Sequence, residues 1–167
     1  MGIYAAYHQD ARNKVTHFVG VPVIVLSLMI PLSWLRFEGV SAAVVTTAVL
    51  LAYYLALDLW LGFAMCIVMG ALLGLGQLIA DQGALAGWSW FAGLFVGGWI
   101  LQLVGHVYEG RRPALADNLF QIFVAPIFLC AELFFALGYK PKLHAAVQAR
   151  AAQMRAVATD KKLTVAA

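Results

Sequence analysis

Long apolar runs separated by short polar segments dominate the chain. They cover about residues 15–35, 41–58, 60–80, 88–109 and 118–138. A run of roughly 20 mainly apolar residues has the length that an α-helix needs to cross a bilayer. The pattern therefore predicts an all-α protein, a polytopic membrane helical bundle with four to five membrane-embedded helices.

Prolines and a polar lead-in modify this picture at both ends of the chain. Residues 4–14 mix tyrosines with charged side chains, which predicts a short helix at the membrane interface. Pro22 and Pro31 interrupt the first apolar run, so we expect that element to be bent or partly re-entrant. Pro126 interrupts the last run, which we expect to enter the membrane and return, or to lie along its surface.

The composition supports an integral membrane protein. The chain is 63% hydrophobic and 11% charged, whereas soluble domains have about 25% charged residues. Its net charge of +3 is too small and too scattered to indicate a nucleic-acid partner. Cys66 and Cys130 lie inside apolar runs, and we expect both to be free thiols.

The basic residues predict which way the chain faces. They gather at 12–14, at 111–112 and along the C-terminal tail, and cytoplasmic segments are rich in Lys and Arg. Four full crossings then separate the first two groups, and 118–138 returns so that both chain ends lie on the cytoplasmic face; a fifth full crossing is the alternative. We predict a membrane-embedded domain at 1–143 and a basic amphipathic tail at 144–167 that lies on an anionic lipid surface.

Small residues share one face of the helix predicted at 60–80. Gly70 and Gly74 lie there one turn apart, and small side chains let two membrane helices approach closely. We interpret this face as a packing surface between helices.

A polar stripe closes the helix predicted at 88–109. Gln102, His106 and Glu109 fall within one narrow arc at about 100° per residue. Polar and ionisable groups are costly inside a membrane and are usually kept there for a function. The stripe is therefore the first candidate for a functional site.

Two more histidines lie near the start of the chain. Asn13 and His17 are one helical turn apart and face the same way. His8 and His17 are nine residues apart, which is about half a turn out of phase on one helix, so they can meet only if the chain bends between them. The predicted topology places both, with His106, toward the cytoplasmic side. The interpretations left open are a metal site and three separately satisfied side chains, while His144, in the basic tail, is expected to take no part.

Several short motifs together resemble one known family. The stretches concerned are Tyr7-His8, Asn13-x-x-x-His17-x-x-Gly20-x-Pro22, Gln102-x-x-Gly105-His106-x-x-x-Gly110-x-x-Pro113-Ala114-Leu115, Pro126-x-Phe128 and Glu132. They resemble the small membrane 2-hydroxy fatty acid dioxygenases that carry out α-oxidation in phytosphingosine breakdown. The resemblance covers about residues 4–143. One departure lies before the fourth helix, where eukaryotic members can carry a histidine and this chain has Asp81.

The resemblance implies an Fe(II)-dependent dioxygenase whose iron ligands are His8, His17 and His106. Its substrates would be a 2-hydroxy fatty acid and O2, and its products CO2 and a fatty acid one carbon shorter. The membrane would be the endoplasmic reticulum of a eukaryote or the cytoplasmic membrane of a bacterium, and the topology counted from the basic residues makes the site face the cytoplasm.

The remaining polar residues are candidates for supporting roles in that chemistry. Glu109 is expected to orient an imidazole, to act as a base or to be a ligand, and Asn13 to support His17. Gln102, Arg111 and Arg112 are candidates to bind the substrate carboxylate, with headgroup anchoring as the alternative for the two arginines. The alternative function is a non-catalytic transporter or lipid-binding protein with a His/Glu proton relay.

Overall fold

The structure is a computed structural model that describes residues 1–110 and 120–166, with side chains described as far as Val157. Its elements in chain order are α1 (Gly2–Ala6), α2 (Ala11–Trp34), β1 (Arg36–Phe37), β2 (Val40–Ser41), α3 (Ala42–Leu57), α4 (Leu59–Ala80), α5 (Ala84–Glu109), α6 (Gln121–Ala136) and α7 (Pro141–Ala166). The two strands form one short antiparallel hairpin, whose turn residues Glu38 and Gly39 both have positive φ. Apart from that hairpin the described chain is helical, as the apolar runs predicted.

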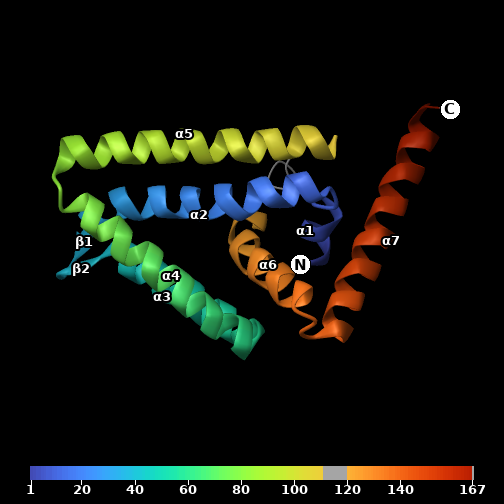
Figure 1. The fold of residues 1–167 in the computed structure, drawn as a ribbon, viewed down its shortest axis with the longest axis horizontal. Coiled ribbons are helices and arrows are strands. Elements are labelled where there is room, and N and C mark those ends of the chain that lie inside the picture. Colours follow the sequence, from blue (N-terminus) through green and yellow to red (C-terminus); the bar gives the residue numbers. More distant parts are fainter. Residues whose placement is uncertain (111–119, 167) are drawn as a thin grey trace.

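The long helices α2 and α5 lie side by side and antiparallel, and they form the frame of the molecule (Figure 1). Glycines make this close approach possible. A Cβ atom on Gly98 of α5 would lie 3.2 Å from the carbonyl oxygen of Gly20 in α2, and one on Gly20 would lie 2.6 Å from Nε2 of Gln102. The glycines that the sequence suggested for this purpose do not serve it, because a Cβ atom on Gly70 or Gly74 would meet nothing within 4 Å.

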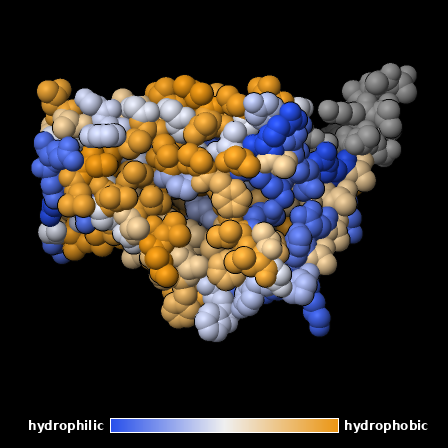
Figure 2. All heavy atoms as spheres, in the orientation of Figure 1, coloured by the Kyte–Doolittle hydropathy of each residue, from blue (hydrophilic) through white to orange (hydrophobic). Residues whose placement is uncertain are grey.

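Three helices are long and apolar enough to cross a membrane: α2, α4 and α5. The helices α3 and α6 are also apolar, but each has 16 residues and so spans about 24 Å, less than the roughly 30 Å of a hydrocarbon core. Apolar side chains cover much of the face shown in Figure 2, and hydrophilic residues gather near its two ends. The described structure therefore supports three membrane-spanning helices.

In each of two sequence predictions about irregular elements, one of the alternatives is wrong. The first apolar run is not partly re-entrant, because α2 continues through Pro22 and Pro31 as one 24-residue helix; packing against α4 and α5 sustains it where the two prolines lack an N–H. The last run does not turn back on itself within the described residues, since α6 is one helix that contains Pro126. The connection between α4 and α5 is shorter than the gap between the apolar runs at 60–80 and 88–109, because α5 begins at Ala84 after Gly83, whose φ is 99°.

The C-terminal helix α7 packs on the N-terminal helix α1, although the sequence suggested that it lies only on a membrane surface. Val147 and Ala151 are 6% and 1% exposed and join a core cluster with Tyr4, Ala5 and residues of α6. Both α1 and α7 lie at the end of the α2–α5 pair opposite the β-hairpin (Figure 1). The predicted boundary between the membrane-embedded domain at 1–143 and the tail at 144–167 falls inside α7. The division into these two units stays a prediction. Cys66 and Cys130 are free, as expected.

Candidate metal centre

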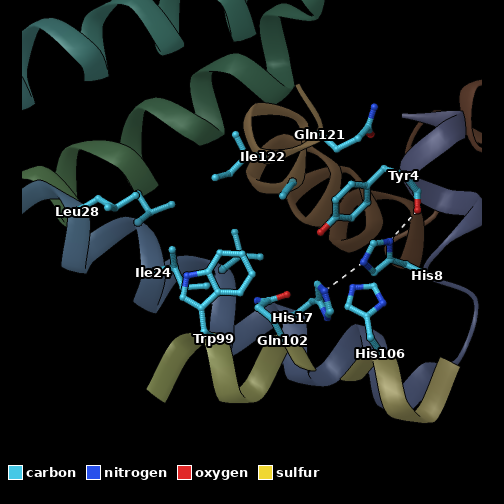
Figure 3. A pocket seen from close by; sticks show the side chains of 13 residues that line it. Tyr4, His8, His17, Ile24, Leu28, Trp99, Gln102, His106, Gln121 and Ile122 are labelled. Carbon is cyan, nitrogen blue, oxygen red and sulfur yellow. Dashed lines mark hydrogen bonds between the residues drawn. The ribbon is translucent and has the colours of Figure 1, made fainter. Parts of the chain in front are cut away.

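Three buried imidazoles converge where α1, α2 and α5 meet (Figure 3). His17 projects from the second turn of α2 and His106 from the last turn of α5, while His8 lies in the turn between α1 and α2. The ring centroids of His8, His17 and His106 lie 4.5 to 5.1 Å apart. One nitrogen of each ring lies within 4.8 Å of the other two, so the three side chains can hold one metal ion. The bend expected between His8 and His17 is thus present.

Helix-end chemistry produces that bend. Asp10 caps the N-terminus of α2 by accepting a hydrogen bond from the backbone N–H of Arg12 at 2.8 Å. Its extended backbone separates α2 from the turn that follows α1, so the two helices are not continuous. On the other side, Gly110 ends α5 with a φ of 65°, a left-handed conformation that glycine adopts without a Cβ penalty. Both caps lie within a few residues of the imidazoles, so local sequence fixes where His8 and His106 point.

Hydrogen bonds to backbone carbonyls fix two of the rings. Nδ1 of His8 lies 2.7 Å from the carbonyl oxygen of Tyr4, and Nδ1 of His17 lies 2.8 Å from that of Asn13. Because a carbonyl only accepts, both Nδ1 atoms carry the proton in a neutral ring, and both Nε2 atoms are left with a lone pair. The two Nε2 atoms lie 3.1 Å apart. Two lone pairs that face each other at this distance repel, and a proton or a metal ion between them would relieve that repulsion.

This donor set fits a first-row metal ion. Metal-binding histidines commonly donate their other N–H to a backbone carbonyl, as His8 and His17 do. Two nitrogens that bind one ion at about 2.1 Å and at a right angle lie about 3 Å apart. Burial, followed by the nearby His17, lowers the pKa of His8 to about 3, so this imidazole is neutral at pH 7, as ligation requires. His144 is outside the cluster and stacks on Phe135 at 4.7 Å.

Glu109 lies beside the centre and ties its surroundings together. Its buried carboxylate accepts hydrogen bonds from the backbone N–H groups of Gln9 and Asp10 at 3.0 and 2.8 Å and from Nδ2 of Asn13 at 3.2 Å. It also pairs with Arg155 of α7 at 3.2 Å. Through these hydrogen bonds, Glu109 connects the end of α5 to the bend in which His8 lies. Among the described residues, Glu109 is not part of the three-histidine cluster.

Asn13 supports His17 through its backbone and the bend through its side chain. The carbonyl oxygen accepts from His17, while the amide Nδ2 donates to Glu109 and, at 3.3 Å, to the carbonyl oxygen of Tyr7. Asp81, which the sequence analysis noted as a departure from the family, is far from the centre. It caps the end of α4 beside the start of α5, and Ala84 and His106 are separated by 22 residues of helix rise, or about 33 Å.

A cavity of about 610 Å³, including its open mouth, begins at the three imidazoles. Apolar residues of α2, from Val21 to Leu28, form one wall, and Trp99 of α5 and Ile122 of α6 lie across from it (Figure 3). The full lining comprises Tyr4, His8, His17, Val21, Ile24, Val25, Leu28, Trp99, Gln102, His106, Gln121, Ile122 and Ala125. The cavity thus has one polar end and a long apolar body.

The lining contains one amide that the sequence singled out for the site and one that it did not. Gln102 is 7% exposed, and its Nε2 has no hydrogen-bond partner among the described residues. Gln121 is 5% exposed, and its Oε1 also has no hydrogen-bond partner among the described residues. Its position as a polar residue in the last apolar run was the sequence signal that could have identified it. Tyr4 was also missed as a site residue, although it lies one turn before His8. Arg111 and Arg112 lie outside the described residues.

Comparison with known proteins agrees with this geometry. A family model described as 2-hydroxy-palmitic acid dioxygenase Mpo1-like matches residues 1–137. The chain is 36% identical over 152 residues to the 2-hydroxy-palmitic acid dioxygenase MPO1 of Saccharomyces cerevisiae, and the alignment covers 89% of this chain and 85% of the yeast protein. No solved structure matches. All three histidines lie within the matched residues, and the chain belongs to the 2-hydroxy-palmitic acid dioxygenase Mpo1-like family.

Proposed function

We propose that this protein is an Fe(II)-dependent dioxygenase that cleaves 2-hydroxy fatty acids into CO2 and a fatty acid one carbon shorter. The observation that carries the proposal is the cluster of His8, His17 and His106 at the closed, polar end of an apolar cavity. Homology to a 2-hydroxy-palmitic acid dioxygenase supports the substrate class.

His8, His17 and His106 would hold the ion. Three neutral imidazoles leave positions open on a six-coordinate metal. When bound, Fe(II) would supply positive charge for an anionic hydroxy acid and the capacity to activate O2. The overall reaction balances without a further reductant, since a 2-hydroxy acid plus O2 yields the shortened acid, CO2 and one water molecule.

The apolar body of the cavity suits the alkyl chain of such a substrate. From His17 to Leu28 the wall of α2 extends over 11 residues, or about 16 Å of helix rise. Burying hydrocarbon there is favourable in proportion to the area removed from water. A substrate that lies along this wall presents its carboxyl end to the imidazoles and to Gln102.

Gln102 would bind the substrate carboxylate through its unpartnered Nε2. Asn13 and Glu109 would act as positioning residues, the first at His17 and at the bend, the second at the bend alone. The proposed roles of Arg111 and Arg112, binding the substrate carboxylate or anchoring to lipid headgroups, rest on the sequence. A His/Glu proton relay has less support, because Glu109 pairs with Arg155 and Glu132 pairs with Lys14 at 2.5 Å.

The position in the membrane is part of the proposal. The metal centre would lie at the cytoplasmic face, with membrane lipid around α2, α4 and α5; the basic groups at 12–14 and in the tail support this orientation. Counting α3 and α6 as embedded as well gives five helices, within the four to five that the sequence predicts. The compartment is the cytoplasmic membrane for a bacterial chain and the endoplasmic reticulum for a eukaryotic one.

Glu109→Gln should weaken metal binding by about 10–100-fold, the usual effect of losing a group that supports a metal ligand. Glutamine removes the charge that faces Arg155 and places an NH2 group against the N–H donors of Gln9 and Asp10. Iron affinity measured by competition with a chelator gives the result. Glu38→Gln, in the exposed hairpin turn, is the matched control. An unchanged affinity in the Glu109 variant would remove this residue from the proposed support.

The reaction itself can be tested with labelled substrate. Protein purified in detergent, loaded with Fe(II) and given 2-hydroxypalmitate labelled with ¹³C at the carboxyl carbon should release ¹³CO2 and equimolar pentadecanoate, both measurable by mass spectrometry. Palmitate, which lacks the hydroxyl group, should give neither product. Absence of the shortened acid with iron bound, or equal turnover after iron is removed, would contradict the proposed function.

A further inference from the structure

Tyr4 is held firmly against the metal centre. It is 5% exposed, and its ring stacks on His8 with centroids 3.9 Å apart and planes 7° apart. The ring of Phe128 contacts it at 4.8 Å. Its backbone carbonyl accepts the hydrogen bond from Nδ1 of His8. The phenol ring is thus fixed in direction by contacts that do not involve its hydroxyl group.

The hydroxyl group of Tyr4 points into the cavity, toward the side on which His17, Gln102 and Trp99 lie (Figure 3). It makes no hydrogen bond to any residue in the described part of the chain. Tyr54 shows the usual arrangement in the same molecule, because its buried hydroxyl donates to the carbonyl oxygen of Phe123 at 2.8 Å. The Tyr4 hydroxyl therefore faces the space of the cavity without a protein partner, where it can donate to a bound ligand.

The chemistry of the lining indicates which ligand atom meets this hydroxyl. The described residues that line the cavity include no Lys, Arg, Asp or Glu. Besides the imidazoles, the groups that can donate there are neutral: the Tyr4 hydroxyl, the side-chain amides of Gln102 and Gln121, and the Trp99 indole. A phenol carries its proton at neutral pH, so the Tyr4 hydroxyl can donate. A buried carboxylate oxygen of a bound hydroxy acid requires such donors.

We propose that the Tyr4 hydroxyl donates a hydrogen bond to the carboxylate of the bound 2-hydroxy acid and so positions the substrate beside His8. The proposal rests on the proposed function and adds a residue to it. Gln102, whose Nε2 is unpartnered, supplies a second donor from α5. Recognition of the carboxylate then combines the metal charge with neutral donors from α1 and α5.

The test is Tyr4→Phe, which keeps the ring, its stacking on His8 and the backbone carbonyl while removing only the hydroxyl. Binding of 2-hydroxypalmitate to Fe(II)-loaded protein is measured by calorimetry without O2, alongside bound iron. We expect unchanged iron and an affinity reduced about tenfold or more, which is typical of a lost hydrogen bond to a charged group. Hexadecane-1,2-diol, which lacks the carboxylate, should bind both proteins equally.

Tyr54→Phe is the matched control, because it removes a buried tyrosine hydroxyl outside the cavity lining and should leave substrate affinity unchanged. Equal affinity of the wild type and Tyr4→Phe for the hydroxy acid would overturn the proposal, as would loss of iron in Tyr4→Phe. A wild-type protein that binds iron but no hydroxy acid would instead overturn the proposed function, and the proposal for Tyr4 with it.

Discussion

Replacing His8, His17 or His106 with alanine is expected to remove bound iron and turnover together. Each imidazole is one of three buried donors whose nitrogens lie within 4.8 Å of one another, and the described cavity lining offers no carboxylate to replace it. Two imidazoles alone hold a divalent ion far less tightly, and we expect affinity to fall more than about 100-fold, beyond the usual effect of losing a supporting group. Iron content of purified protein and release of pentadecanoate are the two measurements.

His144→Ala is the control for that series. This imidazole stacks on Phe135 and lies 3.4 Å from Nε2 of Gln148, away from the cluster. Iron and turnover should therefore remain near those of the wild type. Thermal unfolding of each variant separates loss of the metal from loss of the fold. A folded His17→Ala variant that retained stoichiometric iron would refute the assignment of the centre.

Gly105→Ala is expected to have a comparable effect without touching a ligand. A Cβ atom at this position would lie 2.5 Å from Oδ1 of Asn13 and 3.1 Å from Nδ1 of His17, and it would also overlap Oγ1 of Thr16. The helices α2 and α5 must separate to admit it, which moves His106 away from His17. Displacement of a reacting group by about 1 Å can cost about 100-fold in rate, and we expect a loss of at least that size in turnover with weakened iron binding.

Gly93→Ala on the same helix is the matched control, since a Cβ atom there would meet nothing within 4 Å. Alanine is also the better helix former by about 1 kcal/mol. This variant should keep wild-type iron and turnover, and its unfolding temperature should not fall. If Gly105→Ala behaved in the same way, the tight α2–α5 contact would not be what sets the distance between the histidines.

The apolar pattern was sufficient to predict the helical class and the approximate place of each long helix, because burial of apolar surface in lipid or protein requires runs of that length. It failed where packing decides. The two prolines in α2 suggested an interruption, yet the element continues through both as one helix packed against α4 and α5. Similarly, glycines at 70 and 74 and at 98 and 105 look alike in sequence, and only the second pair lies against another helix.

For the site, the sequence together with its family resemblance was enough to predict His8, His17 and His106 as one set of metal ligands. The chain has four histidines, three lie near polar residues at predicted helix ends, and a bend was required for two of them to meet. Only the tertiary structure decided the rest: that Glu109 binds backbone N–H groups and Arg155, that Asn13 supports His17 through its carbonyl, and that Tyr4 lies in the cavity wall. These contacts join residues that are 46 to 100 positions apart, or depend on side-chain direction, and periodicity within one helix carries no information about either.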